Sequence, residues 1–306
     1  MSQRDVTIVE VSARDGLQND PAFLSTEQKV ELVARTTAAG LDRAEVASFV
    51  NPKRVPQMAD AEGVLEGLAS ELSPAQLTRI GLVLNVRGIE RAKETSLQEV
   101  NVVVVSTDTF AQRNQGQDTE GLIEVLRQVV PIAKEAGIKP TVTLAASFGC
   151  PFEGDVPIDR SVKLVEQCAE AGAEEIALAD TIGVGGPLDV RRRFDAVRAV
   201  TGELPLRAHF HNTRNTGYAN ALVAYEAGVT ILDASLGGIG GCPFAPKATG
   251  NIATEDLVYM FERSGVRTGV DLDALIDHAE WLQNALGHDI TGQLSKAGNF
   301  PGQLLD

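Results

Sequence analysis

The stretch Leu204-Pro-Leu-Arg-Ala-His-Phe-His211 has the composition of a buried strand and contains two of the four histidines in this 306-residue chain. Side chains at positions i and i+2 of a strand point the same way, so His209 and His211 would face one site. Two neutral imidazoles held by a stiff backbone are good metal ligands because each offers a nitrogen lone pair. An H-x-H pattern is by itself a weak signal, and packing of both histidines in the core is the alternative.

This stretch is one of eight short apolar or β-branched runs along the chain. The runs are Thr7–Ser12, Ala44–Phe49, Arg79–Asn85, Val100–Ser106, Lys139–Ser147, Glu175–Asp180, Leu206–His211 and Ile231–Leu236. Stretches with the apolar spacing of helices lie between them, for example Thr26–Ala39 and Gly121–Ala136. This alternation predicts an α/β fold, a (β/α)8 TIM barrel. An open doubly wound sheet is the alternative, but no G-x-G-x-x-G follows the first run.

The C-terminal part of the chain continues with helical patterns. One begins at Thr254-Glu-Asp256 and another covers Leu272–Leu286, and no shift in composition marks a separate domain. We therefore expect residues 1–306 to form a single TIM-barrel domain. Its additional C-terminal helices, in residues 265–306, would pack on the barrel as an extension.

Composition excludes several classes of function. The formal net charge of −15 disfavours nucleic acid and anionic membrane surfaces as partners. We find no apolar export segment near Met1 and no apolar run long enough to span a membrane. Cys150, Cys168 and Cys242 are odd in number and far apart, which argues against a disulfide framework. We expect a cytoplasmic protein without nucleic-acid or membrane partners.

Polar residues follow most of the predicted strands. In barrels of this kind the active site lies at the C-terminal ends of the strands, so these residues would converge on one barrel end. They are Arg14, Asp15, Gln18, Glu45, Ser48, Asn85, Ser106, Ser147, Asp180, His209, His211 and Asn251.

Four of these residues form a mixed oxygen and nitrogen ligand set for a divalent cation: Asp15, His209, His211 and Asn251. The set suits Mg2+ or Mn2+ and fits Zn2+ less well. Asp15 could instead cap the turn before Gly16, and Asn251 could cap the helix that begins at Thr254. Those alternatives do not explain why all four would meet at one barrel end.

Other residues of the set suggest catalytic chemistry. The guanidinium of Arg14 could stabilise an oxygen that becomes negative during a reaction. Glu45 and Asp180 lie in otherwise apolar runs, so each must face water or a partner, and a structural ion pair is an equal alternative. Cys242 lies beside four glycines and before a proline, which suggests a mobile loop that carries a thiol acid or base.

Six motifs resemble one known family. They are the segments Glu10–Asn19 (EVSARDGLQN), Ser48–Met58 (SFVNPKRVPQM), Gly149–Gly154 (GCPFEG), Asp180–Gly185 (DTIGVG), Gly238–Ala245 (GIGGCPFA) and Gly250–Met260 (GNIATEDLVYM). Together they resemble the 3-hydroxy-3-methylglutaryl-CoA (HMG-CoA) lyase family, which belongs to the pyruvate-carboxyltransferase-like, metal-dependent TIM barrels. The resemblance extends over nearly the whole chain up to about Leu286.

The resemblance implies a reaction and assigns roles to residues. The reaction is the retro-Claisen-type cleavage of HMG-CoA to acetyl-CoA and acetoacetate, with an acyl-CoA as the bound partner and a homodimer or higher homo-oligomer as the assembly. The implied metal ligands are Asp15, His209, His211 and Asn251, and the implied catalytic residues are Arg14, Glu45, Asp180, His209 and Cys242. We assign substrate binding to Gln18, Asn85, Ser147 and Lys296.

Departures from the family pattern leave the acyl group open. The family usually reads Asp-Thr-Tyr-Gly-Gln after the histidine pair, whereas this chain reads Asn212-Thr-Arg-Asn-Thr216. Arg214 either holds a substrate carboxylate or lies on the outer surface, and we favour the second. The basic residue that the family commonly carries near Gln283–Asp289 is missing, so Lys296 is the candidate for contact with CoA.

Other functions remain as alternatives. One is a lyase for a related 3-hydroxyacyl-CoA, such as a longer 3-alkylglutaryl-CoA or a thioester of the methylmalyl or citramalyl type. A Claisen-type synthase is less favoured, because such enzymes usually add a long C-terminal regulatory region. A non-catalytic metal-binding or scaffold protein would be expected to lack one or more of the residues at the barrel end.

Overall fold

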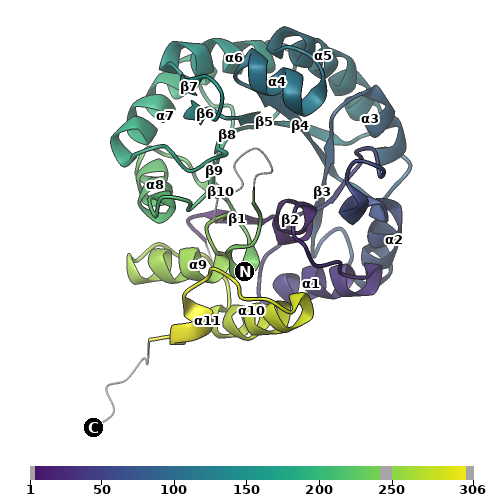
Figure 1. Ribbon diagram of the computed structural model, residues 1–306, viewed down its shortest axis with the longest axis vertical. Helices are drawn as coiled ribbons and strands as arrows, with labels where there is room; N and C mark the ends of the chain where they lie inside the picture. Colours follow the sequence, from purple (N-terminus) through teal and green to yellow (C-terminus); the bar gives the residue numbers. More distant parts are fainter. Residues whose placement is uncertain (1–3, 242–249, 301–306) are drawn as a thin grey trace.

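The computed structural model describes residues 4–241 and 250–300 and has a closed barrel of eight parallel strands at its centre (Figure 1). Around the barrel the strands follow one another in the order β1, β10, β9, β8, β5, β4, β3, β2. Their bounds are β1 Thr7–Glu10, β2 Arg43–Ser48, β3 Thr78–Val83, β4 Glu99–Val105, β5 Lys139–Ala145, β8 Ile176–Asp180, β9 Leu206–Phe210 and β10 Ile231–Ala234. The predicted TIM barrel is therefore confirmed.

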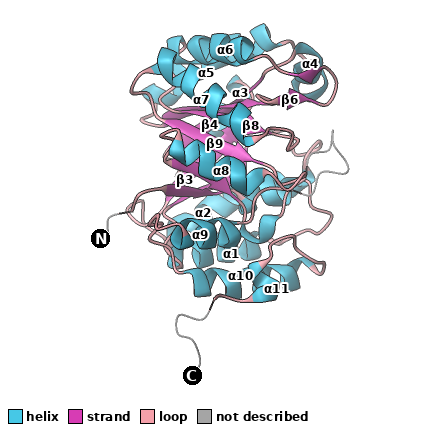
Figure 2. Cartoon of the chain, turned by 90° about the vertical axis from the view of Figure 1, so that its left-hand side faces the viewer, coloured by secondary structure: helices cyan, strands magenta, loops and turns pink. Residues whose placement is uncertain are grey.

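Helices surround the barrel, and the side view shows them on both sides of the strands (Figure 2). The helices that follow the barrel strands are α1 Thr26–Ala38, α2 Ala61–Glu71, α3 Val86–Ala92, α5 Thr119–Glu135, α6 Ile158–Glu170, α7 Pro187–Thr201, α8 Gly217–Glu226 and α9 Thr254–Arg263. Local sequence explains where they begin. At α1, the Ser25 side chain accepts a hydrogen bond from the Gln28 backbone N–H and the Gln28 side chain accepts one from the Ser25 N–H, which forms a capping box.

Two further helices follow α9, as predicted. Helix α10 (Leu272–Leu286) begins at Asp271, whose side chain accepts a hydrogen bond from the Ala274 N–H, and ends at Gly287 in the left-handed conformation. It packs against α1 and α9, and the short α11 (Leu294–Ala297) packs against α10 (Figure 1). Among the described residues, no helix is both long and apolar enough to cross a membrane.

Some elements between the barrel units were not predicted. Helix α4 (Asp108–Gln115) comes between β4 and α5, and the strands β6 (Gly149–Cys150) and β7 (Gly154–Asp155) form a small antiparallel hairpin after β5. Three short turns of other helix types, η1 (Ser12–Gly16), η2 (Pro56–Met58) and η3 (Leu236–Gly238), lie in the loops. Of these, η1 and η3 follow β1 and β10 directly and so lie at the C-terminal end of the barrel.

Charged residues occupy both ends of the barrel interior. Arg43, Glu99 and Glu175 lie buried at the N-terminal ends of their strands, beside a cavity of about 300 Å3. At the other end, alternation along β9 turns Arg207, His209 and the following His211 toward the interior. The two ends therefore differ in their chemistry, and the C-terminal end contains the predicted site.

Candidate active site

A single π-helical turn, η1, positions the first residues of the site. It follows β1 directly, and its Gly16 N–H donates to the Val11 carbonyl at 3.1 Å. Turns of this type are rare and occur often at functional sites. Here the turn carries Arg14 and Asp15 over the C-terminal end of the barrel.

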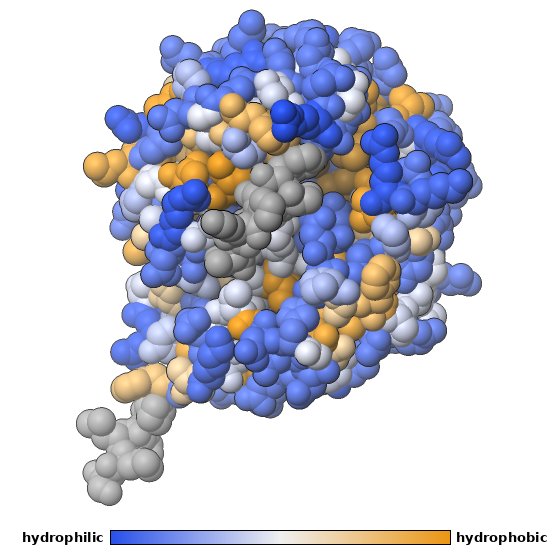
Figure 3. All heavy atoms as spheres, viewed as in Figure 1, coloured by the Kyte–Doolittle hydropathy of each residue, from blue (hydrophilic) through white to orange (hydrophobic). Residues whose placement is uncertain are grey.

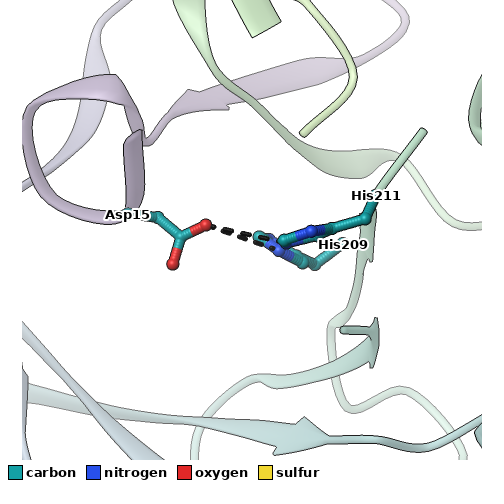
Figure 4. Close-up of side chains that lie close together, drawn as sticks. All are labelled: Asp15, His209 and His211. Carbon is teal, nitrogen blue, oxygen red and sulfur yellow. Dashed lines mark ion pairs between the residues drawn. The ribbon is translucent and has the colours of Figure 1, made fainter. Parts of the chain in front are cut away.

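Asp15 meets both histidines of β9, and their possible ligand atoms all lie within 4.8 Å of one another. Asp15 Oδ2 is 3.9 Å from His209 Nε2 and 3.8 Å from His211 Nε2 (Figure 4). The two rings have centroids 5.2 Å apart. Figure 4 shows the carboxylate of η1 and the two imidazoles pointing toward one another from opposite sides. The structure therefore brings together three of the four predicted metal ligands as a compact triad.

The protonation states of two members of the triad, Asp15 and His211, suit a cation. Burial alone would raise the pKa of Asp15, but the Arg14 guanidinium and the two imidazoles hold it well below its usual range. Burial and the neighbouring His209 ring lower the pKa of His211 to about 4, so His211 is neutral at physiological pH. An ionised carboxylate and a neutral imidazole both present free lone pairs.

The spacing of the triad also fits a bound ion. Two ligands that each lie about 2.1 Å from one ion are roughly 3 to 4 Å apart. The separations of 3.8 and 3.9 Å from Asp15 Oδ2 to the two Nε2 atoms fall within this range. Asp15, His209 and His211 could therefore hold a divalent cation without a large rearrangement.

Asn251 lies against the triad, but its amide nitrogen faces Asp15. Its Nδ2 donates to Asp15 Oδ2 at 2.9 Å and to the Ile239 carbonyl at 3.0 Å. The glycine run permits this approach: Gly240 has a φ of +114°, and a Cβ there would lie 2.6 Å from Asn251 Nδ2. Any other residue would push Asn251 away from the triad.

Arg14 and Glu45 form a buried ion pair beside the triad. One guanidinium nitrogen of Arg14 donates to Glu45 Oε2 and another donates to Asp15 Oδ1. Glu45 Oε1 accepts a hydrogen bond of 3.2 Å from Asn101 Nδ2, which fixes the carboxylate. Arg14 Nε is buried and has no hydrogen-bond partner within the described part of the chain. This fixed guanidinium could stabilise negative charge on a substrate.

Asp180 lies at the end of β8, with its carboxylate turned to its own loop. Its two oxygens accept hydrogen bonds from the N–H groups of Val184 and Gly185, both at 2.9 Å. Burial raises the pKa of Asp180, and these two hydrogen bonds oppose that shift. In residues 4–241 and 250–300, the ion pairs of His209 and His211 go to other carboxylates, not to Asp180.

The predicted substrate-binding residues lie in different environments. Gln18, just after η1, has a buried Oε1 without a partner in the described segments. Ser147 is buried, and its hydroxyl donates to the Leu144 carbonyl at 2.6 Å. Asn85 is exposed and caps α3, with Oδ1 accepting from the Gly88 N–H, while the exposed Lys296 donates to the Ile290 carbonyl at 3.2 Å. Of these four, Gln18 alone has a buried side-chain polar atom without a hydrogen-bond partner in the described residues.

Two further residues were singled out in the sequence, Cys242 and Arg214. Cys242 lies outside the described residues. Arg214 is exposed, and its Nη1 donates to the carbonyls of Ile182 and Gly183 at 2.9 and 3.0 Å. Arg214 is thus bonded to the backbone of the loop that also holds the Asp180 carboxylate.

Asp233, on β10, also lies beside the triad and was not among the predicted site residues. Its Oδ2 lies 3.0 Å from His209 Nδ1, and Arg207 Nε lies 3.4 Å from its Oδ1. The sequence does contain a signal, because both Asp233 and Arg207 are charged residues within apolar strands. Such residues need a partner, which is the argument that already applied to Glu45 and Asp180.

The face that carries the site combines polar and apolar surface. Figure 3, in the same view as Figure 1, shows hydrophobic side chains near the centre of this face within a largely hydrophilic rim. Several exposed large apolar residues follow strands at this end: Phe23 comes after β1, and Val184 and Leu188 come after β8.

The barrel and the histidine–carboxylate cluster define a class of TIM-barrel enzyme, and comparisons identify the family within it. The HMGL-like family model matches residues 5–282. The (R)-citramalyl-CoA lyase of Chloroflexus aurantiacus is 43% identical over 98% of this chain and 97% of its own length. The hydroxymethylglutaryl-CoA lyase of Bacillus subtilis is 39% identical over 93% of this chain and 94% of its own length.

Solved structures of lyases from the same family also match the fold of this chain. An HMG-CoA lyase from Acinetobacter baumannii, in complex with coenzyme A and 3-methylmalate, matches with a TM-score of 0.92 and 39% identity. The match covers 98% of this chain and 97% of that one. The chain belongs to the HMGL-like family, and it is a carbon–carbon lyase.

Proposed function

We propose that this enzyme cleaves 3-hydroxy-3-methylglutaryl-CoA to acetyl-CoA and acetoacetate in a metal-dependent reaction. The triad of Asp15, His209 and His211 beside a fixed Arg14 carries the proposal. Relatives named hydroxymethylglutaryl-CoA lyase, which match over most of the chain, support the choice of substrate.

The proposed cofactor is Mg2+ or Mn2+, with Zn2+ as the less favoured ion. We propose Asp15 Oδ2, His209 Nε2 and His211 Nε2 as ligands, since these atoms face one another. Asn251 would join them through Oδ1 after a half-turn of its amide, which now presents nitrogen to Asp15. When bound, the ion would act as a Lewis acid for the substrate hydroxyl and a neighbouring carbonyl.

The reaction needs a base for the tertiary hydroxyl proton. His209 and Asp180 are the candidates, but the Nδ1 of His209 is already bonded to Asp233. Nε2 is then its only free ring nitrogen and cannot bind a metal and take up a proton at once. We therefore propose Asp180 as the base, and the burial that raises its pKa suits a proton acceptor.

Loss of that proton allows the bond between the carbinol carbon and the thioester α-carbon to break. The electron pair passes to the thioester as an enolate, and Arg14 would stabilise the negative oxygen. Glu45 would hold Arg14 in position through their ion pair. A proton delivered to the α-carbon completes acetyl-CoA. Of the two donors that the family resemblance suggests, Cys242 and His209, we propose Cys242, because the proposed metal ligation and the bond to Asp233 occupy both ring nitrogens of His209.

The remaining contacts concern substrate binding. Gln18 is the candidate with a free buried acceptor, and Ser147 and Asn85 are proposed at the same barrel end. Lys296 is proposed for the CoA phosphates. The exposed apolar residues Phe23 and Leu188 suit the apolar part of the pantetheine arm. Arg214 is exposed and bonded to loop carbonyls, which supports a place on the outer surface.

A second substrate is favoured by one observation, the 43% identity to an (R)-citramalyl-CoA lyase. Citramalyl-CoA has the same thioester, hydroxyl and methyl groups, but its carboxylate is one methylene closer to the carbinol carbon, and cleavage yields pyruvate. The same residues could catalyse both reactions. A pocket discriminates between substrates that differ by one methylene by roughly 10- to 200-fold.

A panel of thioesters tests the proposal. Purified enzyme loaded with Mn2+ is incubated with HMG-CoA, a longer 3-alkylglutaryl-CoA, citramalyl-CoA and methylmalyl-CoA, and the acyl-CoA and keto-acid products are measured. We expect the highest kcat/KM with HMG-CoA. A higher value with citramalyl-CoA would move the assignment to the second substrate, and cleavage of none by metal-loaded protein would refute the lyase proposal.

The proposal also covers the oligomeric state of the enzyme and its location in the cell. Family resemblance leads us to propose a homodimer or higher homo-oligomer, which analytical ultracentrifugation tests. We propose a cytoplasmic location, supported by the free, buried thiols of Cys150 and Cys168.

A further inference from the structure

Asp233 is a buried carboxylate that the triad does not include. It lies on β10, where it pairs in register with His209 of the neighbouring β9. Paired residues of parallel strands point to the same side, so the Asp233 side chain lies beside His209 in the barrel interior. Only 4% of Asp233 is exposed, so its charge and hydrogen bonds must be satisfied within the protein.

Asp233 has two close polar neighbours: an ion pair at Oδ1, which has no hydrogen-bond partner among the described residues, and a hydrogen bond at Oδ2. The guanidinium of Arg207, which is itself buried, lies with Nε 3.4 Å from Asp233 Oδ1. Asp233 Oδ2 lies 3.0 Å from His209 Nδ1. A carboxylate opposite a guanidinium accepts hydrogen bonds and donates none. His209 therefore carries its proton on Nδ1, and the lone pair of Nε2 points to Asp15.

Arg207 is held in turn by residues deeper in the barrel. Its Nη2 donates to Thr143 Oγ1 at 3.3 Å, and its Nη1 lies 3.5 Å from Glu175 Oε1. Besides Asp233, Arg207 therefore has two neighbours: Thr143 accepts a hydrogen bond from it, and Glu175 lies at ion-pair distance. His209 is linked through this chain of contacts to the rigid centre of the barrel.

His211 differs from His209 in the surroundings of its Nδ1 atom. Its Nδ1 is buried and lacks a hydrogen-bond partner among the residues that the structure describes. The two imidazoles of the pair therefore differ: one has a carboxylate behind it and the other does not. Within the described chain, the arrangement at His209 is a specific pairing and does not follow from the H-x-H pattern alone.

We propose that Asp233, held by Arg207, is a positioning residue that fixes the tautomer and the ring orientation of His209 so that Nε2 is preorganised to bind the metal. The role of Nε2 as a ligand rests on the function proposed above. Hydrogen bonds of this kind behind a ligating histidine typically change metal affinity by about 10- to 100-fold.

The first test is a 15N NMR spectrum of the imidazoles in the metal-free, wild-type protein at alkaline pH. The chain has four histidines, so the spectrum is simple, and His209→Gln identifies the signals of His209. We expect a protonated, pyrrole-type Nδ1 and an unprotonated, pyridine-type Nε2 at His209. The reverse tautomer would overturn the proposal without any variant of Asp233.

The second test is Mn2+ affinity, measured by calorimetry. Asp233→Asn should weaken binding by about 10- to 100-fold and disturb the tautomer, and Asp233→Glu should restore part of both. Glu175→Gln is the matched control, because it removes a buried carboxylate from the other side of Arg207 without touching His209. It should bind Mn2+ as the wild type does, because Arg207 keeps its contacts with Thr143 and Asp233.

The outcomes separate this proposal from the proposed function. Wild-type affinity and tautomer in a folded Asp233→Asn would overturn the positioning role even if the enzyme cleaves HMG-CoA. If Glu175→Gln lost as much Mn2+ affinity as Asp233→Asn, Asp233 would have only a general structural role. If the tautomer and affinity behave as expected but no thioester is cleaved, the proposed function fails and the positioning role stands.

Discussion

The two ends of the barrel contain charged residues in different arrangements. At the N-terminal end, Glu99 pairs with Arg43, and Glu175 pairs with Arg43, Lys139 and Arg207. At the C-terminal end, Asp15 has one guanidinium neighbour and faces two imidazoles across about 4 Å. Cations that belong to the protein neutralise the first end. The second end has ligand atoms that converge on one point, and this favours binding of an external cation.

If cavities alone were used to find the active site, they would suggest the N-terminal end of the barrel. The cavity of about 300 Å3 at the N-terminal end is lined by Arg43, Glu99, Lys139 and Glu175. Their carboxylates are already paired with cations, and ends of this kind in TIM barrels contribute to stability. Converging, incompletely satisfied groups are the better guide to the reactive end. Substitutions at the two ends should therefore affect different properties.

The largest effect should come from Asp15→Asn at the C-terminal end. The change keeps the shape of the side chain but removes the charge between Arg14 and the two histidines. We expect kcat/KM with the best thioester to fall by about a thousand-fold or more, because stabilisation worth about 4 kcal/mol is lost. Circular dichroism serves as the control for folding. A loss of less than tenfold would show that the triad is not the reactive centre.

At the opposite end, Arg43→Met should lower the free energy of unfolding and leave catalysis intact. It leaves Glu99 buried, with Lys139 at 3.8 Å as its remaining cation. Breaking such a buried pair costs about 3–5 kcal/mol, which urea denaturation measures. In the folded variant we expect kcat/KM within twofold of the wild type. A large loss of activity would mean that the two ends are not functionally separate.

A smaller effect concerns pH, and the two ends should respond with opposite sign. Burial would raise the pKa of Glu175, but Arg207, Arg43 and Lys139 hold it at about 2, below the ordinary value of 4.5. Its contribution to stability is present above about pH 4.5 and is lost as pH falls toward 2. Near the C-terminal end, burial and the neighbouring Asp256 raise the pKa of Glu255 to about 8. Its contribution is present below about pH 4.5 and is lost as pH rises through 8.

Urea unfolding at several pH values tests this difference. In Glu175→Gln the free energy of unfolding should fall less than in the wild type as the pH decreases from about 4.5 to 2. In Glu255→Gln it should fall less than in the wild type as the pH increases from about 4.5 to 8. Each change should be on the order of 2 kcal/mol. Parallel pH profiles for both variants and the wild type would contradict the assignment.

Much of the fold could be predicted because apolar runs and helical spacing alternate regularly. Each of the eight expected runs overlaps one barrel strand, with starts that agree to within one residue, and the bounds of α10 match Leu272–Leu286. The β6–β7 hairpin could not be predicted, since its strands have two residues each and depend on distant contacts. One such contact is the hydrogen bond of 3.0 Å from Thr107 Oγ1 to Cys150 Sγ.

The site was predictable where chemistry coincides with a strand end or a motif. Asp15 and the histidine pair were found in this way. Asp233 was not, because a single carboxylate in the four-residue strand β10 gives no periodic signal, and its partner His209 lies 24 residues away. Only the register between β9 and β10 places the two side by side. Asn85, predicted from its position after a strand, caps α3 through Oδ1, and its contact with substrate stays a prediction.

Calorimetric titration of the metal-free protein with Mn2+ tests directly whether the C-terminal end of the barrel is the metal site. We compare the wild type with His211→Gln, which removes one member of the triad, and with Arg43→Met, which changes the opposite end. We expect one Mn2+ per chain in the wild type and in Arg43→Met, and binding weakened by at least about 100-fold in His211→Gln. Wild-type affinity in His211→Gln would contradict the claim that the C-terminal end of this barrel is the metal site.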